Sequence, residues 1–493
     1  MCPSASLAKA DSQQSDRKVD VYPVHSLDGA KHNHVLISWV MRFNDVLDSG
    51  KLYLALSKLL EIGDWKKLGG RLKMGTRGKL EIHVPMHFTA SQPAVHYTHD
   101  DHIGIRIEEH PAGSQFPEPT KGPSIQPISN TFRPFLAPQD FPKTIQEMVR
   151  RDVPQVWLHI TSFSNATLLA VAWPHTLMDA IGQQELLRNW SLVLAGREAE
   201  VRPILGARSD ILQEVQQPDK EEEALLINRN RLGRLGSFML VARYIWDKLW
   251  NPALEVRAMF LPREALSRLR SRAEQQIQQA GPQTSDQASF VSEGDVLTAW
   301  ATHAVAVTTA SRPLTVISFF NARFRLPQCK SAAGIYAQNM TLLTFTFLSA
   351  PLARGSLGLI ALSHRRHMAE QTTQQQTSCL LRAVRDELEN ERGLDWFLGE
   401  ASAIPILVNN LTKANLIKSA EFGPAVVSRG DDKKTRSNPL GTMVMYYNQP
   451  VDTSLKSPSS FYMLGKDFAD NYWLMGNLYP RTWLQIDEDL RNM

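Results

Sequence analysis

A histidine and an aspartate lie four residues apart at the end of a strongly apolar run. The run 166–173 ends at Pro174, and His175 and Asp179 follow in the segment PHTLMDAIG. Histidine is the side chain whose unperturbed pKa lies nearest neutral pH, so it can accept and return a proton there. Because Pro174 ends the predicted strand, we expect the imidazole of His175 to project from a strand end into open space, where it could act as a general base.

The spacing alone leaves two roles open for Asp179. Its carboxylate could orient the imidazole of His175, as the third member of a catalytic triad does. Alternatively, it could point away from His175 and pair with a cation, which would hold the turn in shape. An isolated HxxxD pattern is common by chance, and the competing interpretation of His175 is a hydrogen-bonded structural histidine.

Strands and helices alternate on both sides of this motif. VPQVWLHITSF and ATLLAVAW predict two strands that lead to Pro174, and apolar residues at helical spacing predict a helix over 179–196. Further along, SEGDVLTAWATHAVAVTTA predicts a capped helix and LTVISFFNARFRLP a strand. This mixture predicts an α/β fold with mixed β-sheets flanked by helices.

The length of 493 residues exceeds what one hydrophobic core usually serves. We expect a flexible N-terminal tail over 1–18 and an N-terminal domain over 19–196 that carries the histidine motif. A charged, poorly patterned stretch predicts a crossover linker over 197–235, and a C-terminal domain then covers 236–493.

Composition excludes several classes of protein. The net charge of +4 is small for this length and argues against a nucleic-acid-binding protein. The three cysteines fit neither a disulfide framework nor a zinc motif. No secretory leader or membrane span is recognisable, so we expect a soluble, cytoplasmic protein.

Other polar clusters favour structural interpretations. HYTHDDH, from His96 to His102, combines imidazoles and carboxylates that could hold zinc, but a polar turn is the favoured interpretation, and we predict no metal site. His364 lies on a helix beside two arginines and is predicted to belong to a solvated basic face. Neither GxSxG nor a phosphate-binding loop occurs, which argues against a hydrolase elbow and a nucleotide-dependent enzyme.

Taken with its context, PHTLMDAIG resembles the HxxxDG motif of the BAHD-type acyltransferases. This family belongs to the superfamily of chloramphenicol acetyltransferase and peptide-synthetase condensation domains, and the resemblance is to fungal members of secondary metabolism. Ala180 stands where plant members have glycine. The resemblance covers almost the whole chain, since further motifs follow in the expected order: SLDGA, WKKLGGRL, SEGDVLTAW, FFNARFRLP with YAQNM, and KDFADNYWLM.

The resemblance implies two chloramphenicol-acetyltransferase-like domains with an active-site channel between them. Acyl-CoA, often acetyl-CoA, would enter from one face as a co-substrate and a small-molecule acceptor from the other. His175 would take the proton from the acceptor, and Asp179 would pair with Arg323 rather than contact substrate. The resemblance further implies no metal, no bound prosthetic group and a monomeric enzyme.

Two further sets of residues are candidates for the same site. Asn409 lies near the position where family members place an oxyanion donor, and the alternative is a turn former at a strand end. The loop after the degenerate EFGPA motif carries cations that could meet the phosphates of coenzyme A, and a solvated loop is the alternative. These cations are Arg429, Lys433, Lys434 and Arg436.

The sequence therefore predicts an acyl-CoA-dependent acyltransferase that acylates a hydroxyl of a small secondary metabolite. One alternative is a condensation-type enzyme that takes the acyl group from a carrier protein, although such enzymes have a second histidine where this chain has Pro174. The other alternative is a non-catalytic, ligand-binding relative, because function resides in the site and not in the fold.

Overall fold

The structure is a computed structural model, and it describes most of the chain. The described residues are 19–76, 78–128, 130–213, 224–281, 290–330, 333–390, 397–431, 436–452 and 458–493. The predicted tail over 1–18 therefore lies outside the described residues.

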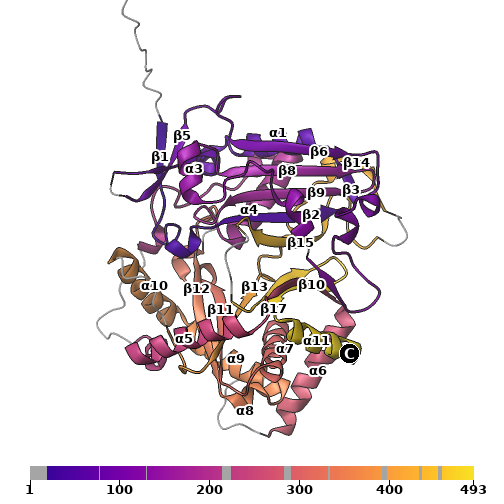
Figure 1. Cartoon of the computed structure of the whole chain (residues 1–493). Helices are drawn as coiled ribbons and strands as arrows, with labels where there is room; N and C mark the ends of the chain where they lie inside the picture. The colour runs from indigo at the N-terminus through magenta and orange to yellow at the C-terminus, as the bar shows by residue number, and fades with distance from the viewer. Residues whose placement is uncertain are drawn as a thin grey trace, which may run out of the picture.

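Two large β-sheets form the upper and lower halves of the molecule in Figure 1. The upper sheet has five strands in the order β15 (Met443–Pro450), β2 (Leu36–Phe43), β9 (Thr167–Pro174), β8 (Val156–Phe163) and β6 (Val95–His102). The lower sheet has seven in the order β12 (Thr341–Leu348), β11 (Leu314–Asn321), β13 (Ile404–Asn410), β16 (Ser460–Lys466), β17 (Tyr472–Leu478), β10 (Glu255–Leu261) and β7 (Ser124–Pro127). Both sheets contain parallel and antiparallel pairs, which confirms the predicted mixed α/β class.

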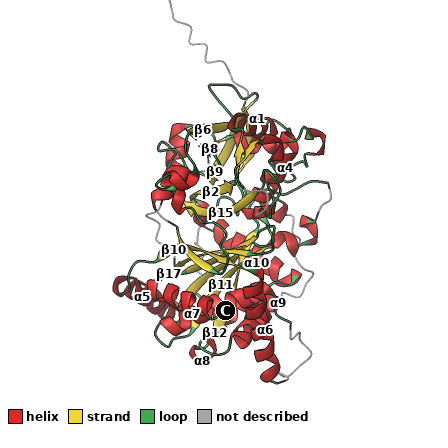
Figure 2. Ribbon diagram, turned by 90° about the vertical axis from the view of Figure 1, so that its right-hand side faces the viewer, coloured by secondary structure: helices red, strands yellow, loops and turns green. Residues whose placement is uncertain are grey.

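Two smaller sheets and the helices complete the fold, and Figure 2 shows the helices gathered around the two large sheets. The small sheets pair β1 (Val19–Pro23), β5 (Leu80–Pro85) and β4 (Arg71–Met74), and β14 (Val426–Arg429) with β3 (Asp45–Leu47). The helices are α1 (Ser49–Leu59), α2 (Arg133–Leu136), α3 (Ile145–Arg151), α4 (Ala180–Leu194), α5 (Arg234–Trp250), α6 (Arg263–Gln279), α7 (Glu293–Thr308), α8 (Ala350–Ala353), α9 (Leu357–Gln371), α10 (Gln374–Glu389) and α11 (Pro480–Arg491).

The two halves exchange strands. β15 and β14 come from the last quarter of the chain yet pair with β2 and β3 of the upper half. In return, β7 comes from the first third of the chain and pairs with β10 at the edge of the lower sheet. A linear division into 19–196 and 236–493 therefore describes chain order and does not coincide with sheet membership.

The strand pair that leads to the histidine motif lies in the centre of the upper half. All residues of β8 and β9 are buried, as expected for strands covered on both faces. The prediction of a polar turn over 96–102 was wrong, because these residues form β6, which runs parallel to β8 in register from Val95↔Val156. Backbone pairing with β8 outweighs the low strand propensity of aspartate there.

None of the helices in the described part of the chain is long and apolar enough to cross a membrane.

Candidate active site

His175 lies in the turn between the end of β9 and the start of α4. Its backbone is held on both sides: its N–H donates to Val35 O at 2.8 Å, and its carbonyl oxygen accepts from Asn339 Nδ2 at 2.8 Å. Val35 precedes β2, and Asn339 precedes β12 of the lower sheet. The position of His175 therefore depends on both halves of the molecule.

The imidazole of His175 is partly buried. Nδ1 is enclosed and has no hydrogen-bond partner among the described residues, which leaves Nε2 as the ring nitrogen that can face a substrate. Burial lowers the pKa of His175, and it outweighs the opposing effects of its own backbone carbonyl, Asp179 and Asn339. The ring is consequently neutral at neutral pH, the form that a general base requires.

Asp179 is almost fully buried and is surrounded by donors. Its Oδ1 accepts from the backbone N–H groups of Ile181 and Gly182, both at 3.1 Å, so the side chain caps α4. Its Oδ2 accepts from Arg323 Nη1 at 2.6 Å and from Met340 N at 3.1 Å. Burial alone would raise the pKa of Asp179, but Arg323 and the backbone donors outweigh burial and hold the pKa below its ordinary value.

Two further donors complete the surroundings of that carboxylate. Asn321 Nδ2 donates to Asp179 Oδ2 at 3.0 Å and Thr341 Oγ1 at 3.3 Å. His175 is not among the hydrogen-bond donors described for the carboxylate. Of the two roles that the spacing left open, this geometry favours pairing with a cation over orienting the imidazole.

Arg323 connects Asp179 to the segment that precedes β12. The guanidinium is 8% exposed and also donates to Tyr336 O at 3.1 Å and to Gln338 O. These bonds fix the backbone that leads directly to Asn339. The arginine therefore supports the position of His175 indirectly, through the chain that bonds its carbonyl oxygen.

Asn339 and Asp28 are positioning residues that the sequence analysis did not assign. Asn339 donates twice to Asp28 Oδ1, through its backbone N–H at 2.7 Å and its Nδ2 at 2.8 Å. Burial raises the pKa of Asp28 to about 6, against the opposing effects of Lys67 and Asn339. Asp28 lies in SLDGA and Asn339 in YAQNM, two of the motifs that carry the resemblance to the family. These motifs were therefore a signal for both residues, but they did not indicate a role.

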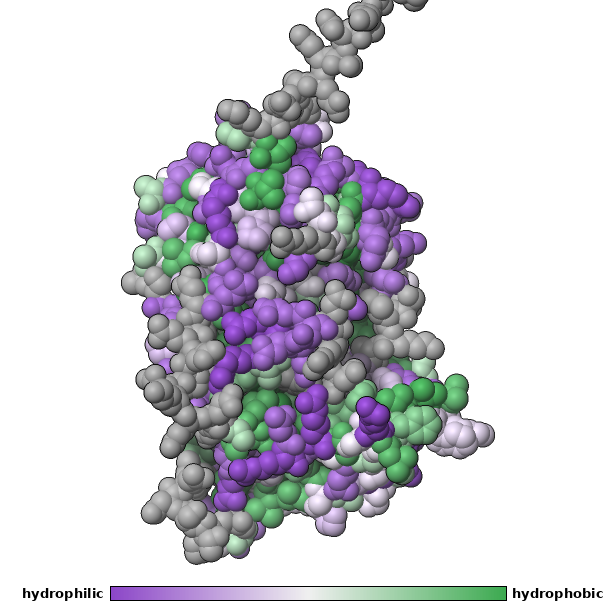
Figure 3. All heavy atoms as spheres, turned by 90° about the vertical axis from the view of Figure 1, so that its left-hand side faces the viewer, coloured by the Kyte–Doolittle hydropathy of each residue, from purple (hydrophilic) through white to green (hydrophobic). Residues whose placement is uncertain are grey.

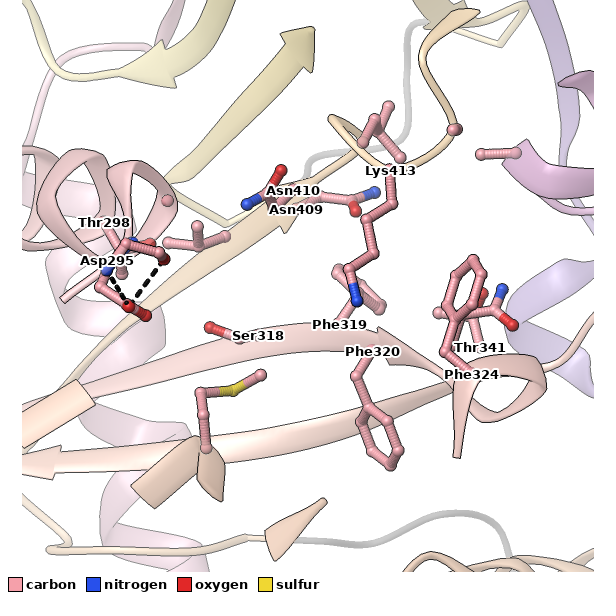
Figure 4. Close-up of a pocket in the computed structure, with 18 of the residues that line it drawn as sticks. Asp295, Thr298, Ser318, Phe319, Phe320, Phe324, Thr341, Asn409, Asn410 and Lys413 are labelled. Atoms are coloured by element: carbon pink, nitrogen blue, oxygen red, sulfur yellow. Dashed lines mark hydrogen bonds between the residues drawn. The ribbon is translucent and has the colours of Figure 1, made fainter. Parts of the chain in front are cut away.

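A cavity of about 230 Å³ lies in the lower half next to the start of α4. Ala180 and Ile181 line it at this end, whereas His175 is not among its lining residues. Figure 4 shows its walls: Ser318, Phe319 and Phe320 come from β11, and Asp295 and Thr298 from α7. The cavity thus reaches the helix of the histidine motif, and a channel that passes the ring itself stays a prediction.

Asn409 lies on β13 and lines this cavity. Its amide makes no side-chain hydrogen bond with any described residue, so it can donate to a ligand. The neighbouring Asn410 also lines the cavity, but its Oδ1 accepts from the backbone of Thr412 at 3.0 Å. Asn409 is therefore positioned for the oxyanion role, which stays a prediction.

The four cations predicted to meet the phosphates of coenzyme A lie in different environments. The side chain of Arg436 is 6% exposed and is ion-paired with Asp45 at 2.6 Å and with Asp431 at 3.0 Å, which gives it a structural role. Arg429 is exposed on β14. Lys433 and Lys434 lie outside the described residues.

Three other cations line the cavity: Arg325, Arg365 and Lys413. Burial, and then the neighbouring positive charges, lower the pKa values of Arg325 and Lys413, so these groups lie close enough to repel one another. In Figure 4 the side chain of Lys413 extends toward the strand that carries Phe319 and Phe320. Like charges held together beside a cavity favour the binding of an anion there.

The basic face predicted around His364 is only partly solvated. Arg365 lines the cavity, and His364 is 6% exposed, with its Nδ1 2.9 Å from Thr346 Oγ1. Burial lowers the pKa of His364 to about 4. The prediction of a solvated face was wrong for this histidine because α9 packs its side chain against β12. No group of three potential metal ligands occurs among the described residues.

Curated proteins and solved structures resemble the chain over nearly its whole length. No protein-family model matches the chain. "O-acetyltransferase PaAT-2" of Phomopsis amygdali is 35% identical over 489 residues, which cover 96% of this chain and 98% of that protein. "Acetyltransferase BOT5" of Botryotinia fuckeliana is 33% identical over 510 residues, which cover 98% of this chain and 92% of that protein.

Among solved structures, the crystal structure of F. graminearum TRI101 complexed with coenzyme A and T-2 mycotoxin shares the fold. The TM-score is 0.65 at 15% identity, over 95% of this chain and 97% of that one. With the identities above 30% over nearly the whole chain, the chain therefore belongs to the BAHD-type acyltransferases, in the branch of fungal acetyltransferases.

Proposed function

We propose that this enzyme transfers an acyl group from acyl-CoA to a hydroxyl of a small secondary metabolite. The favoured acyl group is acetyl. The observation that carries this proposal is a neutral, partly buried His175 whose enclosed Nδ1 leaves Nε2 to face substrate. The fungal acetyltransferase relatives support the reaction, and the neighbour complexed with coenzyme A supports the donor.

His175 takes the proton from the acceptor hydroxyl at Nε2 as the oxygen attacks the thioester carbonyl. A tetrahedral intermediate forms with a negative charge on the former carbonyl oxygen, and Asn409 is the candidate donor to that charge. When the intermediate collapses, the carbon–sulfur bond breaks, and the imidazolium returns the proton to the departing thiolate. No covalent acyl-enzyme is needed in this sequence of steps.

The remaining assignments in the proposal concern positioning and binding. Asp179 and Arg323 hold the turn of the motif and do not contact substrate. Arg429, Lys433 and Lys434 remain candidates for the coenzyme A phosphates. Arg325, Arg365 and Lys413 join them because they line the cavity. We also propose that 197–235 links two domains and that the enzyme is a monomer.

A direct assay tests the reaction. The purified enzyme is incubated with acetyl-CoA and a panel of hydroxylated terpenoids and polyketides, and thiol release is measured together with the mass of the product. His175→Ala should lower kcat/KM by about 10²–10⁴-fold. The matched control is His303→Gln, because His303 lies on α7 away from the motif, and it should keep wild-type turnover.

Three outcomes would contradict the proposal. Acceptor-dependent thiol release that survives in His175→Ala would remove the base from the mechanism. Acylation from a carrier-protein thioester, with no turnover of free acetyl-CoA, would support the condensation-type alternative. Binding of acetyl-CoA with no product from any acceptor of the panel would favour a non-catalytic relative.

A further inference from the structure

Helix α5 carries an apolar face that points away from the protein. Of the 20 large apolar side chains exposed among the described residues, eight lie on this helix of 17 residues. They are between 38% and 75% exposed, so their clustering is not the scattered exposure normal for a protein surface. They are Leu235, Phe238, Met239, Val241, Ile245, Trp246, Leu249 and Trp250.

The apolar residues follow the helical period on the outward side. Positions 235, 238, 242, 245 and 249 recur in steps of three and four residues, which places them on one face. The inward side carries the partly buried residues Ser237, Leu240, Tyr244 and Asp247. The pattern is the reverse of an ordinary surface helix, whose apolar face is buried against the core.

The helix is attached firmly to the lower half. Asp247 accepts from Arg312 Nη1 at 2.7 Å, and that arginine also donates to Ser402 O at 2.6 Å. Just before the helix, Leu232 N donates to Phe397 O at 2.9 Å. Figure 3 shows α5 as a largely apolar projection at the lower right. Figure 2, which views the molecule from the other side, shows the same helix projecting at the lower left.

The charges on α5 identify the kind of partner. Arg243 borders one edge of the apolar face, and Arg234 and Lys248 border the other. Arg234 and Arg243 have no carboxylate partner in the described part of the chain. The helix has one acidic residue, Asp247, whose carboxylate is already paired with Arg312.

This charge pattern favours an anionic lipid surface over a second copy of the chain. Two copies of α5 packed face to face would bring cations together without acidic residues to pair them. An apolar face with Trp and Leu, flanked by Lys and Arg, is the composition of helices that lie in the plane of a membrane interface. The helix of 17 residues is about 25 Å long, which is long enough to lie along a membrane surface.

We propose that α5 docks the enzyme reversibly onto an anionic membrane. The apolar side chains enter the boundary between headgroups and acyl chains, and the exposed Arg234 and Arg243 contact the anionic headgroups. The rest of the protein stays outside the bilayer. The predicted cytoplasmic location would present this helix to the leaflet that carries anionic lipid.

Vesicle co-sedimentation of the full chain tests this proposal. Wild-type protein is mixed with phosphatidylcholine vesicles that contain about 30% phosphatidylserine, with pure phosphatidylcholine vesicles, and with the anionic vesicles at high salt. We expect binding to the anionic vesicles and a fall of about tenfold in partition coefficient in either of the other conditions.

Variants then locate the contact. Trp246→Ser combined with Leu249→Ser should lower the partition coefficient on anionic vesicles by at least about tenfold. The matched control is Leu484→Ser, because Leu484 is 71% exposed on α11 and should not affect binding. Circular dichroism and the melting temperature check folding, so the result does not depend on the acyl-transfer activity.

Three results would overturn the proposal. The wild-type protein could remain in solution with every vesicle, or the double variant could bind as well as wild type. Finally, the wild type could be a dimer without lipid and the double variant a monomer, in which case the apolar face belongs to an interface between copies.

Discussion

Replacing Asp179 with asparagine removes the charge that faces Arg323 while keeping nearly the same side-chain volume. The carboxylate is 4% exposed, and each of its oxygens accepts at least two hydrogen bonds. In asparagine an NH₂ group would replace one of these oxygens, and this donor would face only other hydrogen-bond donors. Breaking one side of a buried ion pair costs about 3–5 kcal/mol, because the other charge stays buried without its partner.

That loss is large relative to the net stability of a protein, which is about 5–15 kcal/mol. The unfolding entropy is about 2.1 cal/mol/K per residue. If all 493 residues unfold together, a destabilisation of this size lowers the melting temperature of the protein by roughly 3–5 °C. Calorimetry of wild type and Asp179→Asn measures this shift. Turnover should fall in parallel, because the turn that holds His175 loses its anchor.

A double-mutant cycle separates the pair from its surroundings. Arg323→Met should destabilise by a similar amount, and the combination with Asp179→Asn should cost less than the two single changes together. An Asp179→Asn variant that melts like the wild type and loses only kcat would refute this reasoning and restore the triad role.

Four further predictions concern the site. Burial lowers the pKa of His175 below its ordinary value of 6.5, and only the neutral imidazole can act as the base. The value of kcat/KM should therefore rise with pH along a limb whose midpoint lies below 6.5, and a midpoint above 7 would contradict this. Asn339→Ala should lower kcat by about tenfold with a smaller effect on KM, and it should move that midpoint further down, because the amide raises the pKa of His175. Gly182→Ala should destabilise by about 1–3 kcal/mol in urea unfolding, because the new Cβ would overlap the backbone oxygen of Ala337. Gly104→Ala, whose new Cβ would meet nothing within 4 Å, should not destabilise. Asn409→Ala should lower kcat by about 10²–10³-fold with little change in KM in steady-state kinetics, and an unchanged kcat would exclude it as the oxyanion donor.

The local geometry of the motif could be predicted from the sequence because its determinants are local. Pro174 ends β9, and Asp179 caps α4 through bonds to residues two and three positions ahead. The period of apolar residues likewise located β8, β9 and α4. The pairing of Asp179 with Arg323, 144 residues away, came only from the resemblance to a family.

Features that depend on distant partners were not predictable from patterns. Arg436 looked like part of a charged loop, but it pairs with Asp45, 391 residues earlier in the chain. The cavity cations Arg325, Arg365 and Lys413 come from three separate segments, and no periodicity encodes their proximity. For the same reason, no local pattern revealed that β15 completes the upper sheet.

The histidine motif is bonded to both halves of the molecule, and this arrangement explains why its turn needs both. β9 supplies the rigid strand before His175, but Val35 and Asn339 hold its backbone from opposite sides. The cap of α4 is bonded in turn to Arg323, just after β11. A general base must stay within hydrogen-bond reach of the proton that it removes. Because these bonds join segments that lie more than 130 residues apart along the chain, a relative shift of the two halves would move His175 and uncouple the base from its substrate.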